Sequence, residues 1–177
     1  MATRAATELE RLLDRVEKRQ IPAEPGWAGQ VALEIGKLFR VQPDEVAVLE
    51  LASRGKMLKF VLPEKLQAVG SIPLSSTTAL AARTARERRA DIVNNFASSR
   101  HATVFEGVPQ GRRTSESIQK IMSIPILSGD EVLGVAQISR KGDSAGDAGP
   151  DFSAKDLSDL QALNALLGRF LALHRTV

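Results

Sequence analysis

The 177-residue sequence contains no cysteine. This absence excludes disulfide bonds, thiolate nucleophiles, iron–sulfur clusters, zinc–thiolate sites and chromophores attached through a thioether. Histidine is also scarce, because the chain has only His101 and His174, which are too few for a metal site built from several imidazoles. We therefore expect no metal and no cofactor.

Long apolar runs are missing too. No stretch approaches the roughly 20 residues needed to span a bilayer, and the first ten, M-A-T-R-A-A-T-E-L-E, lack the apolar segment of a secretory signal. The chain is 43% hydrophobic and 25% charged, which is typical of a soluble globular protein. We expect a cytoplasmic protein that binds no membrane. Because the length suits one domain, we also expect no output domain in this sequence.

The motifs of common enzyme mechanisms are absent as well. Serine, histidine and aspartate all occur, but no spacing suggests a catalytic triad or a nucleophile elbow. The sequence also lacks a glycine-rich phosphate loop. We therefore expect that the protein is not an enzyme.

The formal net charge of +3 is small and unevenly spread. Four arginines against one glutamate fall within seven residues, and the rest is close to neutral, so the sequence does not predict a broad nucleic-acid surface. Guanidinium groups match phosphate and carboxylate, which makes Arg83 and Arg86, on one helix face, candidates for binding an anion with Arg112 and Arg113. The alternative is a solvated helix face.

The stretch from Gln119 to Lys141 is expected to form the centre of the fold. Two apolar runs flank Ser128-Gly129-Asp130, and glycine and aspartate tolerate a tight turn, so the pattern predicts an antiparallel hairpin. In the second run the side chains that would point to one face of the strand are mostly apolar, and so are those that would point to the other face. Such a strand needs cover on both faces, with helices on one and helices or long loops on the other.

The irregular segment 94–117 interrupts this regular pattern, and loops of that length in compact domains are usually functional or mobile. A candidate site is therefore expected there. Helices are expected at 3–19, 27–40 and 154–174, and a further helix is expected to begin at a cap within 75–78 and to end at residue 89. Further strands are expected at 46–52, 57–62, 71–74 and 90–93.

The first and last helices carry apolar stripes that suggest a helix partner. We expect residues 1–21 to form a dimerisation helix and residues 22–177 to form the main domain, with a homodimer as the favoured assembly. The alternative is that the stripes pack on each other within one subunit. The predicted interface residues are Leu9, Leu12, Leu13, Val16, Leu167 and Phe170.

Several short motifs occur in an order that resembles the GAF domain family. The family has a serine and a proline in one strand, Gly-Val in the next, and Phe-Ser or Phe-Thr before its final helix. The resemblance covers roughly Pro25 to Leu173. The matching positions here are Ser123, Pro125, Gly134, Val135, Phe152 and Ser153.

This resemblance implies an α+β, profilin-like fold in which about six antiparallel strands lie between helices and loops, here with an extra N-terminal helix. It also implies a pocket between the sheet and residues 77–111. Amides and a histidine can bind a ligand there, or they can satisfy loop backbone while the aromatic residues fill the core. The ligand-binding candidates are Thr78, Asn94, Asn95, Phe96, His101 and Phe105.

Comparison with ligand-specific GAF members excludes some activities. Cyclic-nucleotide members carry Asn-Lys, then Phe, then Asp-Glu, whereas this chain has Ser139-Arg140, keeps Phe152 and Asp156, and has Leu157 in place of glutamate. Helix capping explains the retained positions equally well. Bilin-binding members and free-methionine-sulfoxide reductases use cysteines, which this chain lacks.

The resemblance implies a non-catalytic regulatory module that binds an unidentified small molecule and signals through its terminal helices to a separate protein. The alternative is a structural interaction or dimerisation domain. In that case its pocket is occluded by side chains such as Phe96, Phe105 and Met122.

Overall fold

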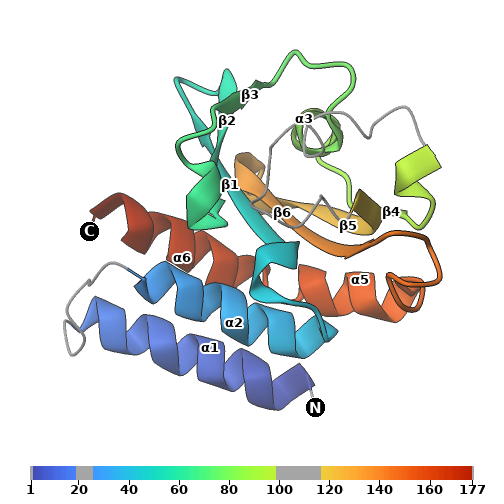
Figure 1. The fold of residues 1–177 in the computed structure, drawn as a ribbon. Helices are drawn as coiled ribbons and strands as arrows, with labels where there is room; N and C mark the ends of the chain where they lie inside the picture. The colour runs from blue at the N-terminus through green and yellow to red at the C-terminus, as the bar shows by residue number, and fades with distance from the viewer. Residues whose placement is uncertain (1, 19–25, 99–116, 177) are drawn as a thin grey trace.

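A six-stranded antiparallel sheet forms the centre of the computed structural model, which describes residues 2–18, 26–98 and 117–176 (Figure 1). The strand order is β3-β2-β1-β6-β5-β4. This confirms the predicted α+β class and sheet. The strands are β1 (Val46–Ala52), β2 (Met57–Leu62), β3 (Ser71–Pro73), β4 (Asp91–Val93), β5 (Ser117–Ser128) and β6 (Glu131–Gly142).

The described helices cover the two faces of the sheet unequally. In Figure 1 the helices labelled α1, α2, α5 and α6 lie below the sheet, whereas α3 lies above it. No helix among the described residues is long and apolar enough to cross a membrane. The helices are α1 (Ala2–Glu17), α2 (Trp27–Phe39), α3 (Leu80–Glu87), α5 (Ala154–Gln161) and α6 (Asn164–Thr176), with short 3-10 turns at Pro43–Glu45, Glu64–Leu66 and Phe96–Ser98.

The predicted central hairpin is the pair β5 and β6. Gly129 adopts a left-handed backbone with φ of 57° in the turn, which glycine does at little cost. Gly134 allows β6 to approach β1 closely, because a Cβ there would lie 2.1 Å from the Leu49 carbonyl oxygen. The Gly-Val position of the family motif is therefore a packing requirement between two central strands.

Successive residues of the central strands enter different hydrophobic clusters, as strand geometry requires. Val46 and Val48 face the layer of α1, α2 and α6, whereas Ala47 and Leu49 face α3. Both sets are buried. The sheet is thus covered on both faces, as the apolar pattern predicts.

The predicted last helix at 154–174 is wrong in one respect, because the structure has two helices, α5 and α6, with a break between them. Ser153 caps α5 by accepting a bond from the Asp156 backbone N–H, as the sequence predicts. Just after the break, the Asn164 amide donates to the Leu127 carbonyl and accepts from the Leu127 N–H, both at 2.8 Å. This contact joins the start of α6 to β5.

The predicted dimer-interface residues lie in the core of one chain, which corrects the prediction. Each is at most 5% exposed, and α1 packs against α2 and α6. The amphipathic stripe of α1 thus has an internal partner, which is the alternative considered from sequence. The homodimer itself stays a prediction, but these side chains cannot form its surface: Leu9, Leu12, Leu13, Val16, Leu167 and Phe170.

Ionic contacts add to the packing of α1 on α6. Arg169 Nη2 lies 2.6 Å from an Asp14 carboxylate oxygen and 2.8 Å from a Glu17 carboxylate oxygen. The hydrogen bond from Arg169 lowers the pKa of Asp14 below its ordinary value, and the contact with Asp14 raises the pKa of Arg169. The two helices are therefore joined by charge as well as by apolar contact.

We predict that Leu13→Ala lowers the free energy of unfolding by about 2–5 kcal/mol, because it opens a cavity in the core. Glu10→Ala, on the exposed side of the same helix, is the control and should change it by less than about 0.5 kcal/mol. Urea unfolding at several protein concentrations measures both. If Leu13 lies between subunits instead, the wild-type midpoint rises with concentration and the variant loses that rise.

The low pKa of Asp14 predicts a pH dependence. A lowered folded pKa stabilises the fold above the unfolded value of about 3.9, and this contribution is lost as pH falls through the folded pKa. Asp14→Asn should therefore be less stable than wild type at neutral pH and lose less stability below about pH 4. Urea unfolding midpoints measured from neutral pH to below about pH 4 give the difference, and Glu10→Gln is the control. If the midpoints of Asp14→Asn and wild type change with pH in parallel, the prediction is wrong.

Candidate functional site

A buried polar cluster lies on the sheet face beneath α3. Gln137 of β6 lies opposite Ala47 on β1 and Ser123 on β5. Its Nε2 donates to Ser123 Oγ at 3.1 Å, and that oxygen lies 2.7 Å from Thr84 Oγ1 on α3. Gln137, Ser123 and Thr84 are each at most 1% exposed. The cluster therefore joins α3 to the two central strands inside an otherwise apolar layer.

The Gln137 amide is not fully satisfied. Its Oε1 has no hydrogen-bond partner, and it is the one buried side-chain nitrogen or oxygen with this property among the described residues. Exchanging the amide oxygen and nitrogen would only leave the nitrogen unpartnered. A buried polar group in this state costs about 1–3 kcal/mol, so it needs an explanation.

Gln137 lines a small hollow with a volume of about 10 Å³, which is room for about one water molecule. The small side chain of Ala47, directly opposite on β1, helps to leave this space. The other lining residues are Asp44, Glu45, Pro63, Leu66, Ile118, Ile121, Ser139 and Lys141.

The charged residues at the rim of this hollow have structural contacts. Glu45 accepts a hydrogen bond from the Gln42 N–H at 2.8 Å and another from the Lys141 N–H at 2.7 Å. Lys141 Nζ donates to the Asp44 carbonyl oxygen at 3.3 Å. These contacts fasten the start of β1 to the end of β6. The unpartnered Oε1 of Gln137 is consequently the main chemical feature that the hollow offers.

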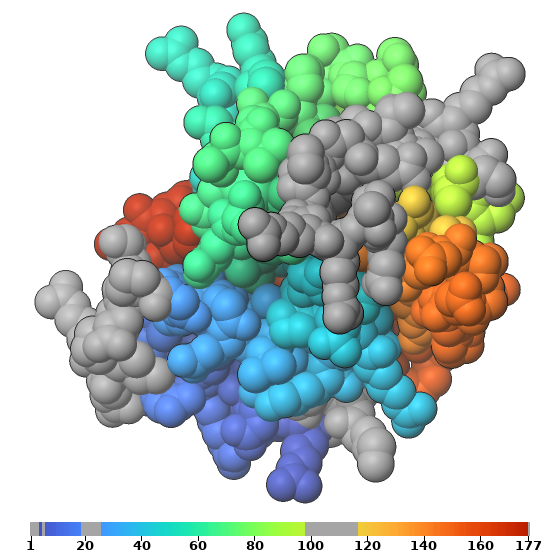
Figure 2. Space-filling view, viewed as in Figure 1, coloured from blue at the N-terminus to red at the C-terminus, as the bar shows by residue number. Residues whose placement is uncertain are grey.

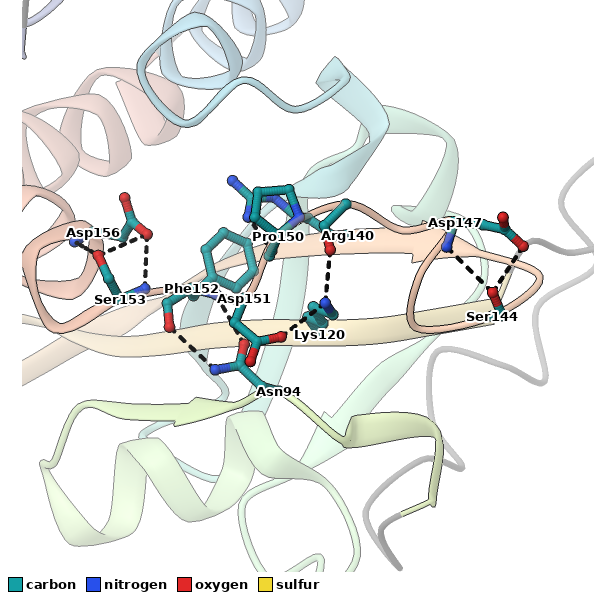
Figure 3. A network of polar contacts seen from close by, with 11 residues as sticks. Asn94, Lys120, Arg140, Ser144, Asp147, Pro150, Asp151, Phe152, Ser153 and Asp156 are labelled. Carbon is teal, nitrogen blue, oxygen red and sulfur yellow. Dashed lines mark hydrogen bonds and ion pairs between the residues drawn. The ribbon is translucent and has the colours of Figure 1, made fainter.

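A second polar arrangement surrounds Phe152, immediately before α5 (Figure 3). The Arg140 guanidinium lies 4.3 Å from the centre of the Phe152 ring, a cation–π distance. The same guanidinium donates to the Pro150 carbonyl and, at 3.1 Å, to the Phe39 carbonyl at the end of α2. Arg140 thereby joins β6, α2 and the approach to α5.

Two further side chains complete this arrangement. Lys120 of β5 donates to the Gly149 carbonyl at 2.6 Å and pairs with Asp151 at 2.8 Å. Asn94, just after β4, donates to the Phe152 carbonyl at 3.1 Å and accepts from the Phe152 N–H at 2.9 Å. We call Asn94, Lys120, Arg140 and residues 149–153 the Phe152 network; it connects three strands to α2 and α5 (Figure 3).

Comparison with known proteins identifies the family to which this architecture belongs. The family model for the GAF domain matches residues 28–171, which is most of the chain. The chain belongs to the GAF domain family. The matched range omits α1, which is the N-terminal helix expected from the sequence.

Several solved structures have the same fold at low sequence identity. The domain from an Acinetobacter phosphoenolpyruvate-protein phosphotransferase is 15% identical, with a TM-score of 0.64 over 97% of this chain and 95% of that chain. The A. aeolicus nlh2 GAF domain in an inactive state is 14% identical, with a TM-score of 0.62 over 97% and 96%. A methyl-accepting chemotaxis protein, residues 122 to 287, is 13% identical, with a TM-score of 0.61 over 92% and 96%. No curated protein matches the chain significantly.

Some positions compared with the cyclic-nucleotide GAF signature have structural roles in this GAF domain. Arg140 stacks on Phe152 and binds backbone carbonyls, while Asp156 accepts from the Ser153 N–H at 2.8 Å in the cap of α5. Helix capping therefore explains Asp156 without a nucleotide. Among the described residues, no group of histidine, cysteine, aspartate or glutamate is arranged to hold a metal ion.

The structure separates the predicted ligand-binding residues. Asn94 is held by Phe152, and Phe96 is 2% exposed in a small core cluster, so both fit the structural alternative and not the predicted ligand-binding role. Asn95 and Thr78 are exposed. The other two predicted ligand-binding residues, His101 and Phe105, lie outside the described residues.

The two predicted anion-binding arginines have different contacts. Arg83 pairs with the Asp91 carboxylate and is therefore neutralised. Arg86 is exposed, and its Nη1 donates to the carbonyls of Leu74 and Ser76 at 2.6 Å each. Only Arg86 thus retains the character of an anion-binding candidate, and Arg112 and Arg113 lie outside the described residues.

Sequence reasoning missed Gln137, Ser123 and Thr84 as one site. A glutamine within a strand that is apolar on both faces is a signal that could have drawn attention to Gln137. Met122, expected as a residue that could fill the pocket, instead faces the helical layer on the opposite side of the sheet. Phe96 does lie on the α3 side, next to Leu80.

We predict that Asn94→Ala destabilises the protein by about 1–3 kcal/mol, because it removes two hydrogen bonds from the Phe152 backbone at a partly buried position. Urea unfolding measures the loss. Gln161→Ala, at an exposed position of α5, is the control and should be nearly neutral. Equal stability of Asn94→Ala and wild type would show that the Phe152 network does not depend on this residue.

Proposed function

We propose that this GAF domain is a non-catalytic sensory or regulatory module that binds a small molecule on the sheet face beneath α3. The observation that carries the proposal is the buried Gln137 amide, which lines a hollow and has an unpartnered end. A bound molecule that satisfies it recovers the free energy that the empty site loses. Family membership supports the proposal, because GAF domains are generally sensory or regulatory modules that bind small molecules.

The contacts around the site supply a route from the ligand to the helices. Ser123 and Gln137 lie on β5 and β6, the strands that also carry Lys120 and Arg140 of the Phe152 network. Through this network the strands are fastened to α2 and to the start of α5. A shift in the central strands on binding would therefore move the helical layer, and a separate output protein would detect that movement.

A homodimer and a cytoplasmic location remain part of this proposal. Because α1 and α6 use their apolar stripes inside one chain, a dimer formed through these helices would need their outer surfaces. Light scattering on the intact protein tests this assembly directly. A monomer mass would leave the ligand-binding proposal standing and would remove dimerisation from it.

A structural interaction domain with a filled interior is the second candidate. The hollow at Gln137 holds about one water molecule, and Phe96 is fully buried on the same side of the sheet. In that case a buried water satisfies the amide and no organic ligand enters.

Substitution of Gln137 by methionine distinguishes the two candidates. Methionine has a similar shape and no polar end, so Gln137→Met should raise the stability of the ligand-free protein by about 1 kcal/mol. For a sensor, native mass spectrometry of freshly purified wild type shows a bound species, and thermal unfolding with nucleotides, amino acids and metabolites shows a shift. The variant loses both responses.

Gln161→Met, an exposed change on α5, serves as the matched control and should keep the ligand response. Wild type that carries no bound species and responds to no compound would contradict the sensor and support the structural domain. A ligand response that survives in Gln137→Met would show that the ligand binds elsewhere on the domain.

A further inference from the structure

Positive charge is concentrated at one end of the molecule. Residues 53–89 contain eight basic and two acidic side chains, a net charge of +6 in a protein whose total is +3, so the remaining residues together carry −3. Apart from the 3-10 turn at Glu64–Leu66, this segment forms the β1–β2 turn, β2, β3 and α3, which lie at the top of Figure 1. Such an asymmetry favours partners with negative charge.

An open hollow of about 450 Å³ lies within this basic end, between the β1–β2 turn, the end of β3 and α3. Figure 2 shows the turn and the α3 region standing on either side of a notch at the top of the view. The lining includes Lys56 and Arg86 and contains no carboxylate, while Met57, Pro73 and Leu74 contribute apolar surface. The hollow thus combines positive charge with an apolar floor.

Arg86 is held in place by backbone contacts. Its Nη1 donates to the Leu74 and Ser76 carbonyls, which fixes the guanidinium at the edge of the hollow. Neither of these bonds uses Nη2 or Nε, and a fixed guanidinium loses less entropy when it binds a carboxylate. Arg83 and Arg89, by contrast, pair with Asp91 and Glu87.

We propose that this hollow is the docking site for an acidic segment of a protein partner, with carboxylates on Arg86 and Lys56 and an apolar side chain on Met57 and Leu74. This rests on the proposed function in one respect, that the module acts through a separate protein. The lining has no aromatic side chain on which bases stack, which favours a peptide over single-stranded nucleic acid. The apolar floor favours a peptide over a free inorganic anion.

The short helix α3 connects this surface to the small-molecule site. Thr84 is buried against Ser123, whereas Arg86, two residues later, is exposed on the other side of α3. A ligand that moves α3 would move Arg86 relative to Leu74. By thermodynamic reciprocity, a partner at the hollow would then change ligand affinity by the same factor.

The test is fluorescence anisotropy with a short fluorescein-labelled peptide of glutamate and leucine, without any small molecule. The wild-type protein should bind it, and Lys56→Glu and Arg86→Gln should each weaken binding at least about tenfold. Lys18→Glu, a charge reversal at an exposed position after α1, is the control and should have little effect. The same peptide with glutamine for glutamate should not bind.

Each other outcome overturns the proposal. No binding at about 1 mM protein removes the docking site, and an equal loss in Lys18→Glu shows only nonspecific attraction. Tighter binding of a single-stranded oligonucleotide assigns the surface to nucleic acid, and displacement of the peptide by equimolar inorganic phosphate assigns it to a small anion. Thermal unfolding verifies that the variants fold. If Arg86→Gln does not fold, Lys56→Glu still tests the proposal.

The peptide result is independent of the small-molecule result. Peptide binding without any ligand detected by native mass spectrometry would support the docking surface and not the sensor. A ligand response without peptide binding would do the reverse.

Discussion

The pairing of β5 with β6 imposes the constraint on which the rest of the structure depends. These strands carry apolar side chains on both faces, so neither face of the sheet centre can remain in water. One face receives α1, α2, α5 and α6, and the other receives α3. Among the described residues the two layers then differ in kind, because α1, α2, α5 and α6 pack on one side and the eight-residue α3, with a polar contact, packs on the other.

Elements governed by local periodicity could be predicted from the sequence. The strands at 46–52 and 57–62 match the predicted bounds, and the cap of α5 at Ser153 and Asp156 follows from neighbouring residues. The family motif at Gly134 also has a local signal, although its cause is the carbonyl of Leu49 on a distant strand.

The remaining features depend on residues that are far apart in the chain. The amide of Asn94 binds Phe152, 58 positions away, and nothing near Asn94 indicates this partner. The break before α6 accompanies a contact of Asn164 with β5, and the stripe of α1 has an internal partner only because α6 returns to it. The unpartnered amide of Gln137 is a property of three neighbouring strands and of α3, so only the tertiary structure could reveal it.

The contact between Asn164 and Leu127 also has a consequence for how the protein avoids aggregation. β4 pairs with only three residues of β5, Ile121 to Ser123, so the outer edge of β5 would otherwise be open near its end. An open strand edge is a template for a strand from another molecule. By occupying both backbone groups of Leu127, one asparagine side chain takes the place of a neighbouring strand at that residue and removes both groups from intermolecular β-pairing.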